Sequence, residues 1–287
     1  MGMQINTNIS ALNAHRNLSN TQNDLSKSLE KLSSGLRINR AADDAAGLSI
    51  SEGLRSQING LNVAARNAQD GISVIQTAEG ALSEVHSILQ RMRDLAVQAG
   101  NDSNNAESRD AIKTEIDGLA SELNRIQTNT EFNGINLMDG STKSFQVGAN
   151  GNAGTDVSNT IAVDLTDLAT ALTGVVTTNA TGGDVTATIT VDTAANAALA
   201  IEALDTSITA ISTSRSELGA KQNRFESAIN SLNVTRENLQ AAESRIRDTD
   251  MAGEMVSYTR SNILSQAGTA MLAQANQSNQ GVLQLLG

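Results

Sequence analysis

The chain has 287 residues, with no Cys, Pro or Trp, one Tyr, three Phe and a formal net charge of −11. The lack of Cys excludes disulfides and thiolate chemistry, and the acidic charge disfavours nucleic acid, whose phosphates require clustered Lys and Arg. With so few aromatic residues and no Pro to interrupt a helix, the composition favours long helical seams of Ala, Leu, Ile and Val over a compact enzyme core.

No targeting or membrane segment is predicted. Residues 1–18 lack the basic start and apolar run of a cleavable signal peptide. No stretch approaches the roughly 18 apolar residues that a membrane helix requires. If the protein leaves the cell, we expect export without a cleavable signal peptide, and we expect no membrane insertion.

Residues 1–40 carry an apolar stripe at helical spacing. Leu25, Leu29, Leu32 and Leu36 follow one another at intervals of four, three and four residues. Many of the residues around the stripe are Asn, Ser and Thr, which compete for backbone hydrogen bonds and are poor helix formers. We therefore expect a helix that is marginal alone and forms against a partner.

Two more helices are predicted before residue 127. Positions at intervals of three and four from Ile58 to Ala96 are apolar, apart from Glu79, His86 and Arg93 on the same track. The apolar pattern resumes from Ile112 to Ile126. The segment 100–105, Gly-Asn-Asp-Ser-Asn-Asn, has the composition of a loop. Residues 44–126 therefore predict two helices joined by this loop.

After residue 127 the sequence changes character. Turn pairs occur at Asn133-Gly134, Asp139-Gly140 and Asn150-Gly151, and such pairs favour hairpins because their turns need positive φ. Residues 150–195 are rich in Thr, Gly, Asn and Asp, with short β-branched runs. We predict hairpins and a small β-rich insert over 130–195.

The strongest periodicity lies between Ile201 and Ile246. Fourteen positions alternate at intervals of three and four, and ten of them are apolar. Sustained over more than six heptads, this pattern is typical of a coiled coil, and the helix would be roughly 70 Å long. Its expected partners are the helices of 44–126, and the fold class is mainly α: a long antiparallel helical bundle or coiled-coil rod.

Residues 250–287 resemble the first forty in composition, being rich in Asn, Gln, Ser and Ala around a few apolar positions. Two weakly helical, amphipathic ends at one end of a rod suggest segments that fold only when they meet a partner. Head-to-tail contacts through such ends need not close, and they then produce an open helical filament.

Catalytic and metal-binding patterns are missing from the sequence. The two histidines, His15 and His86, are far apart and have no HExxH spacing. Asp43-Asp44 suits the start of a helix better than a metal pair, and Asp248-Thr249-Asp250 suits a break or cap between two helices. We therefore expect no enzymatic activity and no cofactor.

Several motifs near both ends are long enough to be diagnostic. They are Met3-Gln-Ile-Asn-Thr-Asn8, Leu32-Ser-Ser-Gly-Leu-Arg-Ile-Asn39, Ala41-Ala-Asp-Asp-Ala-Ala-Gly-Leu48, Glu243-Ser-Arg-Ile-Arg-Asp-Thr-Asp-Met-Ala252, Ala275-Asn-Gln277 and Gln280-Gly-Val-Leu-Gln-Leu-Leu286. Over about 1–140 and 195–287, the chain thereby resembles the bacterial flagellins. The resemblance implies a structural subunit that self-assembles into the extracellular helical filament of the bacterial flagellum for motility, through terminal helices that fold on polymerisation.

The resemblance also implies a division of the chain. Residues 1–45 and 250–287 would form the filament core, and residues 46–140 and 195–249 the rod domain around it. Residues 141–194 would be a variable, surface-exposed β-rich insert. The main alternative is a hook–filament junction protein, which shares flagellin-like ends; a chemoreceptor signalling rod is a weaker one, because no membrane helices are present.

Two sets of packing residues follow from the periodicity and this division. The filament-core set is Ile5, Ile9, Leu12, Leu25, Leu29, Leu32, Leu36, Met251, Met255, Tyr258, Val282, Leu283, Leu285 and Leu286. The rod-domain core set is Ile58, Leu61, Ile72, Ile75, Leu82, Leu89, Ile112, Ile116, Leu119, Leu123, Ile201, Leu204, Ile208, Ile211, Leu218, Phe225, Ile229, Leu232, Leu239 and Ile246.

The family resemblance further implies partners. These are other copies of the chain, a flagellar export chaperone at the C-terminal segment within the type III export route, and the hook-associated and cap proteins. Many flagellins are also ligands of a vertebrate Toll-like receptor. The receptor-contacting motif is matched at Gln90, Arg91, Leu95 and Glu115, with Asp94 where Glu is frequent in the family, so we expect recognition to be retained.

Overall fold

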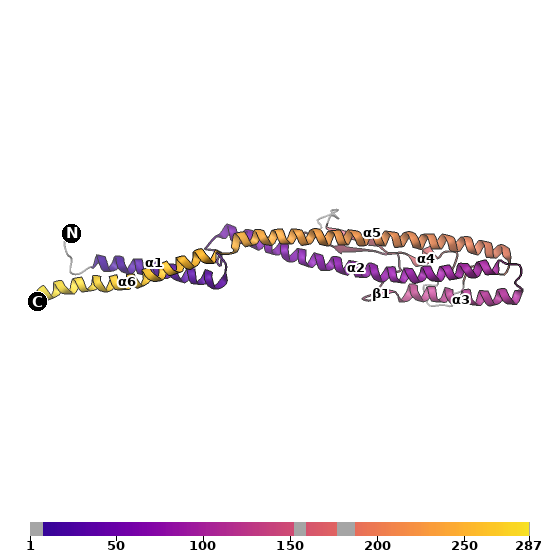
Figure 1. Cartoon of the computed structure of the whole chain (residues 1–287), viewed down its shortest axis with the longest axis horizontal. Helices are drawn as coiled ribbons and strands as arrows, with labels where there is room; N and C mark the ends of the chain where they lie inside the picture. Colours follow the sequence, from indigo (N-terminus) through magenta and orange to yellow (C-terminus); the bar gives the residue numbers. More distant parts are fainter. Residues whose placement is uncertain (1–7, 152–158, 177–186, 287) are drawn as a thin grey trace. The chain divides into compact units, whose positions relative to one another are not determined.

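The computed structural model describes residues 8–151, 159–176 and 187–286, with side chains described only as far as Gln277 in the last range. The described elements are α1 (Ile9–Ser34), α2 (Ala45–Ala99), α3 (Ala106–Asn129), β1 (Glu131–Phe132), β2 (Ile135–Asn136), β3 (Thr142–Gln146), β4 (Thr160–Asp164), α4 (Leu168–Ala171), α5 (Ala194–Arg247) and α6 (Met251–Leu286) (Figure 1). The expected fold class, mainly α with long antiparallel helices and small hairpins, is confirmed.

The chain forms two compact units. Unit 1 comprises Met1–Ser56 and Glu237–Gly287, and unit 2 comprises Gln57–Arg236. The long helices α2 and α5 each contribute residues to both units. Unit 1 is therefore larger than the expected terminal segments 1–45 and 250–287, because it also takes the ends of α2 and α5.

In unit 1, α1 and α6 lie side by side (Figure 1). Asn8 caps α1: its side chain accepts a hydrogen bond from the Ala11 amide and donates one to the Ala275 carbonyl of α6. At the other end of α1, Gly35 adopts a φ of 73° and donates its amide to Lys31, a left-handed helix end that favours glycine. Both ends of α1 are thus satisfied by hydrogen bonds.

The connection between α1 and α2 is held by the junction between α5 and α6. The Arg37 amide donates to the Arg247 carbonyl, and the Arg37 guanidinium donates to the Ile246 carbonyl. In return, the Thr249 amide donates to the Gly35 carbonyl over 3.1 Å. These bonds join the two interhelical breaks, which are more than 200 residues apart in sequence.

Aspartates begin the helices at both breaks, as the sequence predicts. The Asp44 carboxylate accepts the Gly47 amide at the start of α2, and the Asp250 carboxylate accepts the Ala252 amide at the start of α6. Asp43 accepts the amides of Asn39 and Arg40. The Arg40 and Asn39 amides hold the pKa of the Asp43 carboxyl below its usual value.

In unit 2, α2 and α5 run antiparallel. Asn62 accepts a hydrogen bond from Arg236, Glu79 pairs with Arg215, and Arg93 pairs with Asp205 at 2.6 Å. Residues farther along α2 thus contact residues earlier in α5, as antiparallel helices do. Helix α3 lies along α2 (Figure 1). Their buried residues form one core with the hairpin and the insert.

The segment after α3 contains the predicted hairpins and one feature that was not predicted. Asn133 and Gly134, with φ values of 52° and 74°, form the two-residue turn between β1 and β2. Strand β3 pairs antiparallel with β4, and a short helix α4 follows, capped by Asp167. Periodicity could not indicate α4, because a helix of four residues is shorter than two turns.

An aromatic pair anchors the β3–β4 hairpin to the helices. The rings of Phe145 and Phe225 meet edge to face, with centroids 5.7 Å apart, and Phe225 is fully buried. On α2, Gly71 leaves the room that this pair fills, since a Cβ there would lie 2.8 Å from the Phe225 ring. The hairpin also receives hydrogen bonds from Asn67 of α2 and Lys221 of α5.

Candidate assembly surface

The seam between α1 and α6 is made largely of small and polar side chains. On each helix the half-buried and buried positions recur at intervals of three and four, as in a coiled coil. The positions that keep this repeat are Ala11, Ala14, Leu18, Thr21, Leu25, Ser28 and Leu32 on α1, and Glu254, Tyr258, Ser261, Ser265, Gly268, Leu272 and Ala275 on α6. Nine of these fourteen residues are small or polar, so the seam buries less apolar surface than a seam of leucines and holds the two helices together less strongly.

Small residues let the two helices approach closely. A Cβ at Gly268 would lie 3.1 Å from the Leu18 side chain, so Gly268 faces α1 at short distance. Lys31 of α1 and Glu254 of α6 form an ion pair at 3.8 Å near the junction. A partly exposed pair of this kind contributes little to stability, which leaves the seam dependent on close packing.

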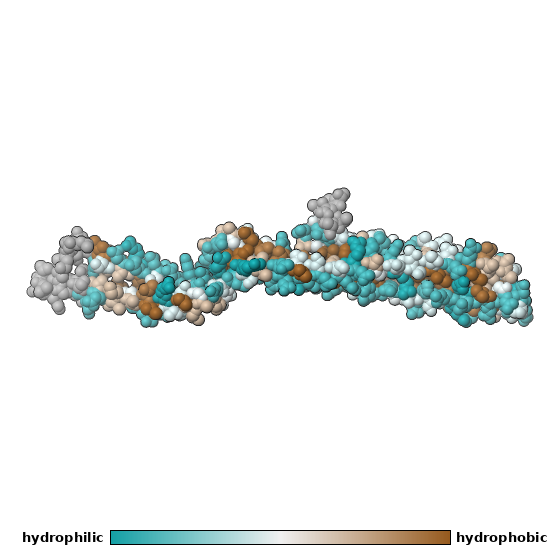
Figure 2. All heavy atoms as spheres, turned by 45° about the horizontal axis from the view of Figure 1, so that its top comes forward, coloured by the Kyte–Doolittle hydropathy of each residue, from teal (hydrophilic) through white to brown (hydrophobic). Residues whose placement is uncertain are grey.

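Nine large apolar side chains of these two helices point away from the seam. On α1, Ile9 and Leu12 are about 60% exposed. On α6, Met251, Met255, Val256, Ile263, Leu264 and Met271 are between 49% and 65% exposed. Figure 2 shows hydrophobic side chains at the surface of this pair. Monomeric proteins rarely leave such a set uncovered.

Along α6 the exposed residues form a continuous ridge. Every fourth residue from Met251 to Met271 is exposed: Met251, Met255, Thr259, Ile263, Ala267 and Met271. Rows at this interval are the ridges that pack into the grooves of neighbouring helices. An open, almost wholly apolar groove of about 570 Å³ lies beside it, lined by Ala252, Met255, Val256, Thr259, Arg260, Ile263 and Leu264.

Charge is distributed unevenly between the units. Unit 1 contains 9 Lys and Arg against 10 Asp and Glu, whereas unit 2 contains 11 against 21. Like charges repel when copies of one chain come together. Unit 1 is therefore nearly neutral and apolar at its surface, and most of the chain's negative charge belongs to unit 2.

The structure divides the expected filament-core residues into three groups. Ile9, Leu12, Leu29, Met251 and Met255 are exposed, whereas Leu25, Leu32, Leu36 and Tyr258 are half-buried within unit 1. Ile5 lies outside the described residues, as do the side chains of Val282, Leu283, Leu285 and Leu286. Sequence reasoning missed Val256, Ile263, Leu264 and Met271, although the four-residue interval from Met255 could have indicated two of them.

The expected rod-domain residues are all buried or half-buried. The buried ones are Ile58, Leu61, Ile75, Leu82, Leu89, Ile112, Ile116, Leu123, Leu204, Ile211, Leu218 and Phe225. The half-buried ones are Ile72, Leu119, Ile201, Ile208, Ile229, Leu232, Leu239 and Ile246. Leu239 and Ile246 lie in unit 1, which includes α5 from Glu237 onward.

A polar patch on α2 and α3 contains three of the four residues matched to the receptor motif. The Arg91 guanidinium donates to the Glu115 carboxylate over 2.6 and 3.0 Å, and Gln90 bonds to His86 on the same helix. Gln90, Arg91 and Glu115 are exposed. Leu95 is only 2% exposed and packs in the core, so its side chain supports the patch from within and offers no contact surface.

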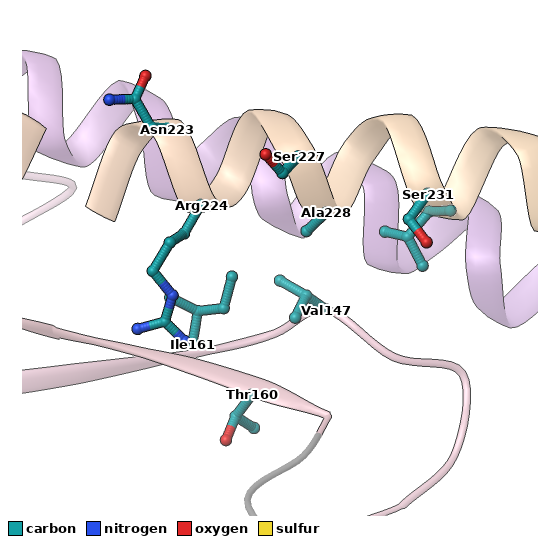
Figure 3. Close-up of a pocket in the computed structure, with 9 residues that line it drawn as sticks. Val147, Thr160, Ile161, Asn223, Arg224, Ser227, Ala228 and Ser231 are labelled. Carbon is teal, nitrogen blue, oxygen red and sulfur yellow. The ribbon is translucent and has the colours of Figure 1, made fainter. Parts of the chain in front are cut away.

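The groove shown in Figure 3 lacks the groups of a catalytic site. The groove between α5 and the β3–β4 hairpin is lined by Val147, Ile161, Ala228 and several Ser and Thr hydroxyls, with Arg224 as its one charged residue (Figure 3). It contains no base beside a hydroxyl. Among the described residues, no three His, Cys, Asp or Glu gather as metal ligands, and no helix is suited to span a bilayer.

Comparisons with known proteins match both the N-terminal and the C-terminal part of the chain to one protein family. Residues 5–143 match the bacterial flagellin N-terminal helical region, and residues 201–286 match the bacterial flagellin C-terminal helical region. A flagellin of Halalkalibacterium halodurans is 54% identical over 99% of this chain and all of its own length. A flagellin of Bacillus subtilis and the flagellar filament 33 kDa core protein of Treponema phagedenis are each 48% identical, with the same coverage.

Proposed function

Since this chain belongs to the bacterial flagellin family, we propose that the exposed apolar faces of α1 and α6 join one copy to the next in the filament. As a flagellin, the chain is a structural subunit of the flagellar filament and therefore an extracellular protein. The family is structural, and its relatives name no catalytic activity. The relatives named above give no support to the junction-protein alternative.

One observation carries the proposal: most of the seam residues of α1 and α6 are small or polar, while nine large apolar residues of the same two helices are exposed. Completing the burial of a Leu- or Ile-sized side chain that is already half-covered contributes about 1 kcal/mol. Nine such side chains are exposed on α1 and α6, which amounts to roughly 10 kcal/mol per subunit before the costs of association. These side chains stay exposed to water in the monomer, and their burial between subunits would stabilise a filament.

The experiment is seeded growth of the purified chain, followed by electron microscopy. Short filament fragments added to monomer should elongate into long, uniform filaments. The charge of unit 2 also predicts faster growth when salt screens its repulsion. Intact monomer that never elongates seeds at any salt concentration would contradict the proposal.

We further propose that the same α6 face binds the export chaperone before assembly, because an apolar ridge left exposed in the cytoplasm would favour aggregation. Hook-associated and cap proteins would meet this face at the two filament ends. Export through the flagellar type III apparatus without a cleaved signal belongs to the same proposal. Binding of purified chaperone to the monomer, weakened by Ile263→Asp, would support it, and an unshortened N-terminus in filament subunits would support the export route.

We also propose that Gln90, Arg91 and Glu115 form a contact for the vertebrate Toll-like receptor. The support is the exposed, hydrogen-bonded geometry of Arg91 and Glu115 together with the sequence motif. Arg91→Ala should reduce receptor affinity at least about tenfold, because a charge-assisted pair in an interface contributes more than 1.4 kcal/mol. The measurement is binding of the monomer to the receptor ectodomain, with Arg66→Ala, an exposed arginine on the same helix, as control. If Arg91→Ala bound the receptor with unchanged affinity, the proposal that Arg91 contacts the receptor would be wrong.

A further inference from the structure

The methionines in the described part of this chain fall into two groups with opposite environments. The sequence contains seven, of which five lie in the described residues. Met92 and Met138 are buried in the core of unit 2, with exposures of 0% and 1%. Met251, Met255 and Met271 are 49%, 54% and 65% exposed. All three exposed thioethers lie on α6.

The three exposed methionines share the α6 ridge defined above. Met251 is its first residue, Met255 its second and Met271 its last. Met255 also lines the apolar groove, next to Val256 and Ile263. In that surface the aliphatic side chains of Val256, Ile263 and Leu264 are inert towards mild oxidants, whereas a thioether is not. The ridge therefore has three reactive atoms in an otherwise unreactive apolar surface.

We propose that Met251, Met255 and Met271 are oxidation sites, and that their conversion to sulfoxides by a peroxide stops the subunit from assembling. The sulfur lone pair attacks one peroxide oxygen and the O–O bond breaks. The sulfur keeps that oxygen as a sulfoxide, and the other oxygen leaves as water after proton transfer. The sulfur is oxidised by two electrons and the peroxide is reduced by two.

The consequence for assembly rests on the proposed function of the ridge. A sulfoxide oxygen is a strong hydrogen-bond acceptor, so burying it in an apolar contact without a donor is unfavourable. Three such groups on one ridge interrupt the surface at both of its ends. Oxidation is reversible by methionine sulfoxide reductases, which act separately on the two sulfoxide epimers. Treatment with both enzymes should restore growth.

Burial also predicts where and when oxidation occurs. In the monomer, the α6 methionines should react well before Met92 and Met138, because peroxide reaches only the exposed thioethers. In the filament, the ridge is covered by neighbouring subunits, so the same methionines should react more slowly. The modification would thus act on unassembled subunits and spare finished filaments.

The test treats intact monomer with graded hydrogen peroxide, locates sulfoxides by peptide mass spectrometry and measures seeded growth. We expect growth to fall at least about tenfold at the dose that oxidises α6 and leaves Met92 and Met138 intact. The matched variant replaces Met251, Met255 and Met271 with Leu, a volume-conserving change. It should assemble normally and resist the peroxide dose.

A second variant, with Leu at positions 92 and 138, should stay as sensitive to peroxide as the unchanged chain. Full growth of the oxidised wild type, or equal loss of growth in the triple Leu variant, would overturn the proposal. Equal oxidation rates for Met255 and Met92 in the monomer would overturn it as well. Failure of untreated chain to grow would instead contradict the assembly proposal, and the order of oxidation would still test the assignment of the sites.

Discussion

Replacing Ile263 with Asp is expected to stop filament growth while unit 2 stays folded. Ile263 is 60% exposed in the middle of the α6 ridge and has no role in the seam with α1. In a filament, a carboxylate there would be buried without a partner, which costs several kcal/mol. The rate of seeded growth should therefore fall at least about a hundredfold, as measured by turbidity and electron microscopy.

Two companion variants make this result specific. Leu29→Asp, on the outer face of α1, should also block growth, because Leu29 is 47% exposed and apolar. Leu199→Asp places the same charge at a residue that is 66% exposed but belongs to unit 2, and we expect this variant to assemble. Growth of Ile263→Asp at the wild-type rate would show that α6 does not provide the contact.

Replacing Phe225 with Ala is expected to lower the free energy of unfolding of unit 2 by about 3–5 kcal/mol. Phe225 is fully buried, and its loss would leave a cavity between Gly71 of α2 and Phe145 of the β3–β4 hairpin. The two surrounding helices are long and stiff, so they cannot collapse into the space. Urea denaturation followed by helical circular dichroism measures the change.

Two glycines of α2 provide the matched controls for that core. Gly71→Ala would place a Cβ 2.8 Å from the Phe225 ring and should destabilise unit 2. Gly80→Ala meets nothing within 4 Å and should stabilise the helix by about 0.5–1 kcal/mol. If both substitutions shifted the urea midpoint in the same direction, the packing of the aromatic pair against Gly71 would be wrong.

The long helices could be predicted because their periodicity is strong and their partners are helices of the same chain. The alternation from Ile201 to Ile246 indicated α5, and the antiparallel pairs Glu79–Arg215 and Arg93–Asp205 confirm its pairing with α2. The helix caps at Asp44 and Asp250 could also be predicted from the sequence, because a carboxylate just before a helix accepts hydrogen bonds from its first free amides.

The orientation of the terminal helices could not be predicted. An apolar stripe normally marks the face that packs within the chain, but here Leu25 and Leu32 lie in the seam whereas Leu29 of the same stripe is exposed. On α6, Gly268 faces the seam and Ile263 faces outward. Periodicity shows that a helix has two faces and does not show which face its own chain covers. For the same reason, the burial of Leu95 became visible only in the packing of unit 2.

Hydrogen exchange of the monomer and of the filament tests the central claim most directly, namely that assembly covers what unit 1 leaves exposed. Amides of α1 and α6 should exchange rapidly in the monomer, because their seam buries less apolar surface than a seam of leucines. In the filament these amides should be protected at least about a hundredfold, while buried stretches of unit 2, such as 82–96, should be protected in both states. Equal exchange of α1 and α6 in monomer and filament would contradict the account.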